Sequence, residues 1–133
     1  MLYIGVDLGT SAVKLLLTDE KGNVQKIVSK EYGLEFPQPG WAQQSAEDWW
    51  TQSIAGLKEL TADCDKSQIA GISFGGQMHG LVILDDQDQV IRPVILWNDG
   101  RTVEEVDYLN ETIGRDKLSE YTGNIAFAGF TAP

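Results

Sequence analysis

The sequence predicts an α/β fold whose mixed sheet begins with an antiparallel three-strand meander and is flanked by helices. Three observations lead to this fold class. Apolar runs of strand length alternate with tight turns over the first 31 residues. A stretch with helical spacing of apolar residues follows, and further short apolar runs and a second helical stretch come after it. Strands interspersed with amphipathic helices in this way are typical of a sheet covered by helices.

The meander is expected over strands 2–8, 12–18 and 24–29. Its first turn is Gly9-Thr10-Ser11 and its second turn covers 19–23. A strand that returns directly as a second strand differs from the strand–loop–helix of P-loop and Rossmann units. The patterns G-x-x-x-x-G-K-[ST] and G-x-G-x-x-G are both missing from the sequence, so we exclude those two nucleotide-binding folds.

The first helix is expected to begin at Ser45, with Asp48 as its capping-box partner. Trp50, Ile54 and Leu57 recur at i, i+4 and i+7, which predicts one buried helical face. We expect three of the four tryptophans, Trp41, Trp49 and Trp50, to be core residues rather than sugar platforms.

The second half of the sequence is expected to begin with a buried strand over 69–74. A hairpin over 80–84 and 90–97 follows, around the acidic turn 85–88. Asp99 is expected to be the N-cap of a second helix. One side of that helix would carry Val103, Val106, Leu109 and Ile113. A short helical turn around Leu118 and an irregular segment over 122–133 complete the prediction.

Composition places the chain among folded proteins of one ordinary domain. It has 133 residues, of which 42% are hydrophobic and 23% charged. The net charge of −10 disfavours nucleic acid and anionic membrane surfaces as partners. No apolar run approaches the roughly 20 residues that span a bilayer, and no signal peptide is evident, so the expected location is cytoplasmic. The single Cys64 is interpreted as a passive thiol.

Asp7 is the first candidate functional residue, because it ends a buried strand where a lone carboxylate is costly. A tight hairpin with an Asp that bonds its own backbone is the simple structural alternative. In the functional interpretation, Gly9 lets the backbone approach a phosphate to which Thr10 and Ser11 donate hydrogen bonds. Asp7 would hold Mg²⁺, which favours a carboxylate together with phosphate oxygens. Followed by a meander, this pattern resembles the phosphate hairpin of the actin-like ATPases.

The segment Gly75-Gly76-Gln77-Met78-His79-Gly80 is the second candidate, and it contains the only histidine of the chain. Its glycines indicate a backbone pressed close to a ligand, although a bulge with a structural histidine is the alternative. We interpret Gln77 and His79 as hydrogen-bonding partners of hydroxyl groups and Met78 as an apolar wall. Asp99 is a third candidate, which as a simple helix cap would leave Arg101 solvated.

Together these segments resemble the FGGY carbohydrate kinases, and within that family the D-xylulose kinases. The resemblance covers nearly the whole chain in the family's order. It rests on the segments IGVDLGTSAVK, FPQPGWAQQSAEDWW, GGQMHGLVILD, RPVILWNDGR and TGNIAFAGFTAP.

The resemblance implies an actin-like, ribonuclease H-like fold and Mg²⁺·ATP-dependent phosphorylation of a ketopentose, with D-xylulose giving xylulose 5-phosphate. It implies that Asp7 lies near Mg²⁺ and the γ-phosphate, and that residues 9–11 form the first phosphate hairpin. Met78 and His79 match the pair that contacts the ketose, with Gln77 and Asp99 as less well supported sugar contacts. The implied partner is a small-molecule sugar, and a homodimer is left open as the assembly.

Because the family is several times longer, residues 1–133 resemble only the N-terminal part of its first, sugar-binding domain. The general-base Asp, the second domain and the ATP-binding half would lie outside this chain, so the fragment alone is expected to be inactive. Three alternatives remain open at this point. They are a kinase for another pentulose or a sugar acid, a non-catalytic actin-like protein switched by nucleotide, and a sugar sensor without catalysis.

Overall fold

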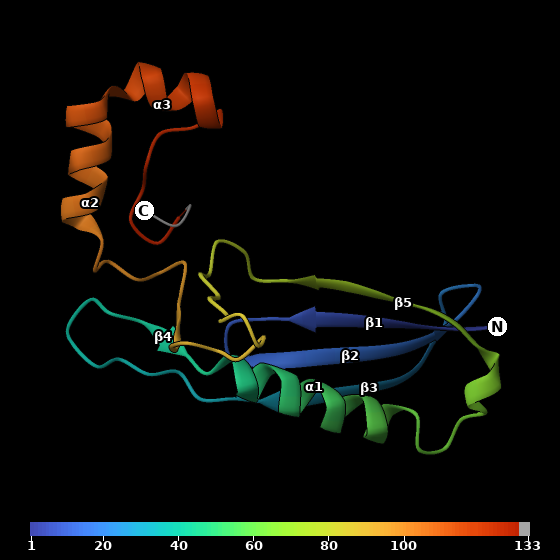
Figure 1. Cartoon of the computed structure of the whole chain (residues 1–133). Helices are drawn as coiled ribbons and strands as arrows, with labels where there is room; N and C mark the ends of the chain where they lie inside the picture. The colour runs from blue at the N-terminus through green and yellow to red at the C-terminus, as the bar shows by residue number, and fades with distance from the viewer. Residues whose placement is uncertain (131–133) are drawn as a thin grey trace. The chain divides into compact units, whose positions relative to one another are not determined.

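The computed structural model describes residues 1–130, which fold into two compact units. Unit 1 consists of Met1–Gly33 and Ala46–Gln77, and unit 2 consists of Leu34–Ser45 and the chain from Met78 onward. Figure 1 shows the long strands of unit 1 and the shorter elements of unit 2. Because each unit is built from two separate stretches of sequence, each is described by itself below.

The sheet of unit 1 contains four strands in the order β3-β2-β1-β5. Their bounds are β1 Leu2–Leu8, β2 Ala12–Asp19, β3 Val24–Glu31 and β5 Ile69–Gly76. β1 runs antiparallel to β2 and parallel to β5, and β2 runs antiparallel to β3, which confirms the predicted meander. β5 extends two residues further than predicted and includes both Gly75 and Gly76.

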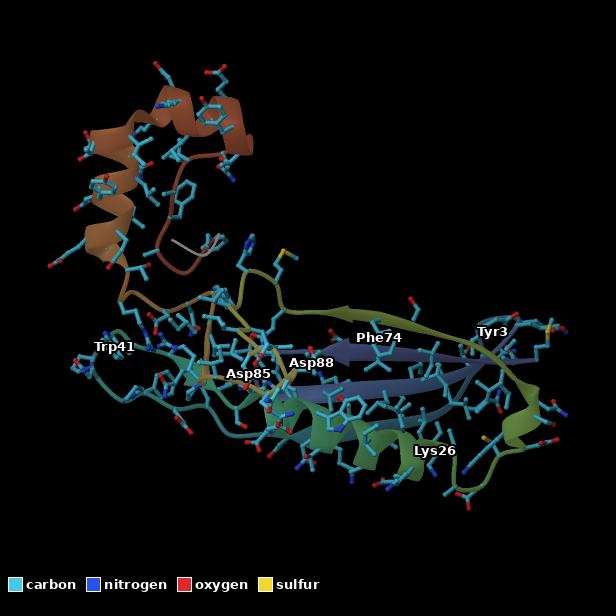
Figure 2. All side chains as sticks on the ribbon, viewed as in Figure 1. Tyr3, Lys26, Trp41, Phe74, Asp85 and Asp88 are labelled. Carbon is cyan, nitrogen blue, oxygen red and sulfur yellow. The ribbon has the colours of Figure 1, made fainter. Side chains whose placement is uncertain are left out.

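One face of this sheet carries the hydrophobic core, against which helix α1 (Ala46–Leu60) packs along β2 and β3. The alternation along β1 and β2 sends every second side chain to this face. The buried members of the core are Ile4, Val6, Val13, Leu15, Leu17, Val28 and Leu60. At the far end of α1, the Lys26 ammonium of β3 (Figure 2) donates to the Glu59 carbonyl at 2.8 Å, which stabilises the helix C-terminus.

Helix α1 begins directly after Ser45, as predicted, and Leu57 packs against the core, but the predicted buried face is wrong at Trp50. Trp50 is 66% exposed, whereas Gly56 and Leu60 are buried. A Cβ atom added at Gly56 would clash with the Leu15 side chain, so this glycine lets the helix lie close to the sheet. The buried face therefore includes Trp49, Gly56 and Leu60. A search for regularly spaced apolar side chains misses this face because Gly56, at its centre, has no side chain.

The 3₁₀ helix η1 (Lys66–Gln68) leads into β5 and is capped by Asp65, whose side chain accepts from the Ser67 amide. Beyond β5 the chain enters unit 2. There β4 (Gln43–Gln44) pairs antiparallel with β6 (Val94–Ile95). None of the helices described within residues 1–130 is long and apolar enough to cross a membrane.

The predicted hairpin of unit 2 is confirmed both near its turn and at its open end, where Leu81 and Ile95 form an antiparallel bridge. Leu84 and Val90 form an antiparallel bridge, and the Ile91 amide donates to the Ile83 carbonyl at 3.0 Å. Between these two contacts the ladder is interrupted, because Pro93 cannot donate a hydrogen bond, and the other edge of Ile95 pairs with Gln43 of β4. The two predicted strands therefore do not form one continuous hairpin.

The second helical region consists of α2 (Val103–Asp107), the π-helical turn η2 (Tyr108–Gly114) and α3 (Arg115–Thr122). The prediction that Asp99 is the N-cap is wrong, because Thr102 holds that position and the Asp99 carboxylate bonds elsewhere. The predicted apolar side is only partly buried, with Val103 53% exposed. A π-helical turn has a longer period than an α-helix, which displaces the predicted spacing.

α3 includes Leu118, which confirms the expected helical turn there. The chain after it is irregular as expected, with a bridge between Phe127 and Phe130. The last part of that predicted irregular segment, 131–133, lies outside the described residues.

Candidate functional site

The turn between β1 and β2 carries Gly9, Thr10 and Ser11 and is held from several directions. The Gly9 amide donates to the Ala12 carbonyl at 3.0 Å and closes the turn. Tyr32, just after β3, donates its amide to the Ser11 carbonyl at 3.2 Å and its hydroxyl to the Gly9 carbonyl. A Cβ at Gly9 would lie 3.1 Å from the Ala12 carbonyl oxygen, so a larger residue would crowd the turn. The hairpin is thus a compact and well-supported backbone loop.

The end of β5 is bonded to the same hairpin. The Gln77 amide donates to the Leu8 carbonyl at 2.8 Å, and the Thr10 hydroxyl donates to Gln77 Oε1 at 3.3 Å. A Cβ at Gly76 would lie 2.7 Å from the Leu8 carbonyl oxygen, so this close approach requires glycine. The structure therefore brings the predicted Gln77 together with the first turn.

Asp7 lies on the face of the sheet opposite α1 and is exposed. Its strand neighbours are Lys14 on β2 and Gly75 on β5, and all three line a hollow of about 410 Å³ together with Ser73. Within residues 1–130 no hydrogen bond or ion pair engages the Asp7 carboxylate. Burial, together with the negative charge of Asp7, raises the pKa of the Tyr32 phenol to about 12. The Asp7 carboxylate is therefore in a position to interact with a cation at the end of the sheet.

The described residues contain no group of three or more His, Cys, Asp or Glu side chains placed to hold a metal ion. A single exposed carboxylate still fits Mg²⁺, which commonly binds one or two carboxylates and takes its other ligands from water and phosphate oxygens. The donor set at Asp7 is of that kind.

Met78 and His79 are the first residues of the long stretch of unit 2, and both are exposed. His79 has a φ of 68°, a left-handed conformation that is uncommon for residues other than glycine. Its imidazole lies against the Phe130 ring, with centroids 4.5 Å apart and planes tilted by 38°. Left-handed conformations of residues other than glycine are energetically unfavourable, and they concentrate at binding and catalytic sites.

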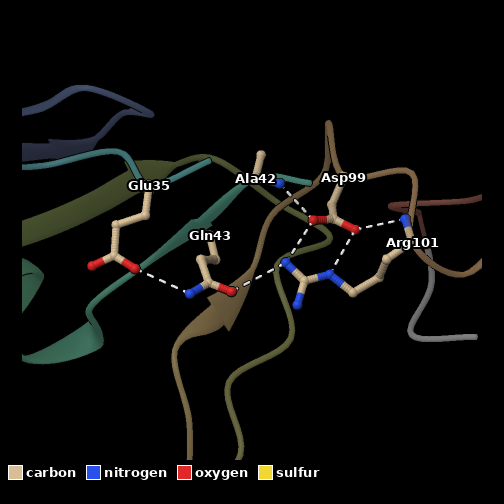
Figure 3. Close-up of polar contacts among 5 residues, drawn as sticks. All are labelled: Glu35, Ala42, Gln43, Asp99 and Arg101. Carbon is tan, nitrogen blue, oxygen red and sulfur yellow. Dashed lines mark hydrogen bonds and ion pairs between the residues drawn. The ribbon is translucent and has the colours of Figure 1, made fainter. Parts of the chain in front are cut away.

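Asp99 and Arg101 form the polar centre of unit 2 (Figure 3). The Asp99 carboxylate accepts from the Ala42 amide at 2.5 Å and from Arg101 Nη2 at 2.8 Å. Its other oxygen accepts from the Arg101 amide and Nε. Arg101 also donates to Gln43 Oε1, and its guanidinium lies 4.0 Å from the centre of the Trp41 ring. Arg101 is therefore buried rather than solvated, with 8% of its side chain exposed.

Burial alone would raise the pKa of Asp99, but hydrogen bonds from Arg101 and Ala42 outweigh it and hold that pKa below the ordinary value. Asp99 is thus a carboxylate fixed by a bidentate guanidinium, a geometry that orients the loop on which both residues lie. The sequence singled out Asp99 and Arg101 as polar residues near each other, but it did not indicate that their partners lie at 41–43. Tyr32 and Phe130 also carried no sequence signal, because isolated aromatic residues are ordinary core residues.

Comparisons with known proteins place the chain in a family. The N-terminal domain of the FGGY family of carbohydrate kinases matches residues 2–133. A xylulose kinase from Bacillus subtilis is 46% identical over 132 residues, which cover 98% of this chain and 26% of that protein. This chain therefore spans about a quarter of the length of that curated relative.

Two solved structures are similar as well. The crystal structure of a xyloylose kinase from Brucella ovis has a TM-score of 0.90 and 42% identity, covering 100% of this chain and 28% of the other. A gluconate kinase from Lactobacillus acidophilus has a TM-score of 0.82 and 28% identity, covering 90% and 24%. These likenesses confirm the actin-like fold class that the sequence predicted. The chain belongs to the FGGY family of carbohydrate kinases, within whose N-terminal domain it lies.

Proposed function

We propose that residues 1–133 are the N-terminal part of the first, sugar-binding domain of a kinase that phosphorylates D-xylulose to xylulose 5-phosphate with Mg²⁺·ATP. The observation that carries the proposal is the 46% identity to a xylulose kinase over nearly the whole chain. The second domain and the ATP-binding half would lie outside this chain, so the 133 residues alone are inactive in this proposal. An ADP-release assay with D-xylulose and Mg²⁺·ATP tests that statement directly.

In this proposal the turn after β1 binds phosphate. Thr10 and Ser11 are the donors, with the Thr10 hydroxyl exchanging its bond to Gln77 Oε1 for one to phosphate. Gly9, whose amide closes the turn, allows the backbone to come close. Bound Mg²⁺ neutralises charge on the phosphate oxygens. Asp7 contributes a carboxylate at the end of β1, directly beside that turn, and holds the cation there directly or through water.

Met78 and His79 are the proposed sugar contacts. The His79 ring donates to or accepts from a sugar hydroxyl, and Met78, which is 67% exposed, contributes an apolar wall. Gln77 and Asp99 are secondary candidates, because Gln77 Oε1 bonds Thr10 and the Asp99 oxygens bond Ala42 and Arg101. Asp99 then contributes by fixing the loop that carries Trp97.

The decisive experiment is Asp7→Asn in a full-length kinase that carries this segment. The amide keeps the shape but loses the charge that acts on the metal and phosphate, so turnover falls by about two orders of magnitude or more. D-xylulose binding, measured separately by calorimetry, remains close to wild type. Asp86→Asn, at another exposed aspartate, is the matched control and leaves turnover unchanged. Near-normal turnover of Asp7→Asn would reduce Asp7 to a turn residue.

A second candidate function is phosphorylation of a sugar acid, which the similarity to a gluconate kinase favours. The two candidates share the phosphate side and differ only in the sugar that binds near His79. Comparing kcat/KM for D-xylulose, D-ribulose and D-gluconate in the same full-length protein decides between them. A higher value for D-gluconate would replace the xylulose assignment and leave the kinase assignment intact.

A further inference from the structure

Four aromatic rings gather in unit 2, and one of them is the imidazole of the proposed sugar contact His79. Phe130 is the central member, 4.5 Å from the His79 ring, 6.5 Å from Trp97 and 6.4 Å from Phe127 between ring centroids. The contacts with Trp97 and Phe127 are edge-to-face, a favourable arrangement for aromatic pairs. Phe130 therefore connects three separate segments of the unit.

Gly129 explains how the Phe130 segment comes so close to the loop after β6. Its φ is 74°, in the left-handed region that favours glycine. A Cβ there would clash with the Trp97 carbonyl and would lie 2.9 Å from the Asp99 carbonyl oxygen. Because those contacts are to backbone, a side chain at position 129 must move the two segments apart. The loop that it contacts is in turn fixed by the Asp99–Arg101 pair.

His79 needs such support. Within residues 1–130 no hydrogen bond holds its imidazole, and the residue is exposed. The second side-chain torsion of histidine is broad, so an exposed imidazole without a neighbour samples many orientations. The Phe130 ring covers one side of the imidazole and restricts that rotation.

We propose that Phe130 is a positioning residue for sugar binding, which orients the His79 ring toward a sugar hydroxyl and is itself placed by Gly129. The inference rests on the proposed role of His79 and extends it. Phe130 does not bond the sugar in this account. It reduces the number of orientations that His79 loses on binding, so its effect appears in sugar affinity and leaves nucleotide affinity alone.

The structural half of the test uses this 133-residue chain. Because the chain has one histidine, its imidazole gives a single set of NMR resonances. In the wild type those ring protons are shifted upfield by the Phe130 ring current, and Phe130→Leu removes the shift. Phe36→Leu is the matched control, since Phe36 is 64% exposed and forms no aromatic pair within residues 1–130. Identical imidazole shifts in wild type and Phe130→Leu would overturn the proposal.

The kinetic half uses a full-length kinase that carries this segment. Phe130→Leu raises KM for D-xylulose about threefold to tenfold and leaves KM for ATP unchanged. Gly129→Ala has the same selective effect, because it moves Phe130 away from Trp97 and His79. Phe130→Tyr keeps the ring and restores a KM for D-xylulose close to wild type. A Phe130→Leu variant with an unchanged KM for D-xylulose would also overturn the proposal.

His79→Ala separates a failure of this inference from a failure of the proposed function. If His79→Ala raises KM for D-xylulose and Phe130→Leu does not, His79 remains a sugar contact and the positioning role of Phe130 is wrong. If His79→Ala itself leaves KM for D-xylulose unchanged, the sugar site has been misplaced and both proposals are overturned.

Discussion

The interior of each unit is stabilised by a different kind of interaction. The buried residues of unit 1 are apolar, from Ile4 on β1 to Leu60 at the end of α1, with Thr61 as the polar exception. The buried set of unit 2 includes Asp99, Gln44 and Asn110 beside its apolar residues. Asn110 bonds both backbone groups of Ala126, and Asp99 bonds the Ala42 amide. Unit 1 thus depends on area removed from water, and unit 2 on directional polar contacts.

This difference bears on the proposed sites. The phosphate turn ends two long strands whose register is set by the buried face, so it is fixed by the whole sheet. Met78 and His79 lie on irregular chain, where polar and aromatic contacts have to fix the geometry. Apolar burial tolerates small displacements, whereas a buried ion pair demands correct geometry. The stability of unit 2 should therefore be most sensitive to substitution of buried polar residues. The stability of unit 1 should be most sensitive to substitutions that change the packing of its core.

The largest effect is expected for Asp99→Asn. The variant leaves the Arg101 guanidinium buried without its charge partner, which destabilises unit 2 by about 3–5 kcal/mol. Amide hydrogen exchange measured residue by residue should show lost protection at 41–44 and 94–101, with β1 and β2 unaffected.

Glu111→Gln is the matched control for Asp99→Asn, because it removes a carboxylate from the exposed Arg115–Glu111 pair of the same unit. Its expected effect is at most about 0.5 kcal/mol. Equal destabilisation by both variants would contradict the view that the buried pair organises unit 2.

Gly56→Ala tests the packing of unit 1. The added methyl group clashes with Leu15, and overpacking of this kind costs about 1–3 kcal/mol. The same substitution usually favours an exposed helix, so a loss of stability identifies the contact with the sheet as its cause. Thermal unfolding provides the measurement, and Gly56→Ala combined with Leu15→Val should recover part of the loss. An increased melting temperature for Gly56→Ala would show that α1 can move away from β2.

Among the three test substitutions, Tyr32→Phe should have the smallest effect, about 1 kcal/mol, because it removes the hydroxyl bond to the Gly9 carbonyl. Its signature is a pH dependence. Burial and the Asp7 charge raise the folded pKa of Tyr32 to about 12, above the ordinary value of 10.0. The contribution of Tyr32 is therefore complete below pH 10.0 and is lost as the pH rises toward 12. The melting temperatures of wild type and Tyr32→Phe should converge as the pH rises from about 9 to about 12. A difference in melting temperature that stays constant over this range would contradict the proposed contribution of the Tyr32 hydroxyl.

The sequence was sufficient where the pattern is local. Period-2 alternation and turn residues predicted all three strands of the meander, since each strand pairs with its neighbour in sequence. The sequence also predicted the segments that carry the candidate site residues Asp7 and His79.

Prediction failed where the partner is remote or lacks an apolar side chain. Gly56 gives no hydrophobic signal, so the buried face of α1 was assigned to Trp50. Asp is a residue type that commonly caps helices, so Asp99 was assigned to a cap. Its actual partner, the Ala42 amide, is 57 residues away in the sequence. The π-helical turn η2 could not be expected either, because the apolar spacing from Val103 to Ile113 suits an uninterrupted α-helix.

The chain passes from one unit to the other three times, after Gly33, Ser45 and Gln77. During synthesis, therefore, every residue of unit 1 has been added once Gln77 is made, while β4 in the segment 34–45 still lacks its partner β6. A nascent chain that has emerged as far as Gln77 therefore holds all of the strands of the sheet, with the twelve residues 34–45 inserted between β3 and α1 before β6 is available to β4. Unit 2 then folds when β6 pairs with β4, whose segment 34–45 is already anchored at both ends in unit 1. This anchoring shortens the search of β4 for β6 and fixes the direction from which β6 can pair.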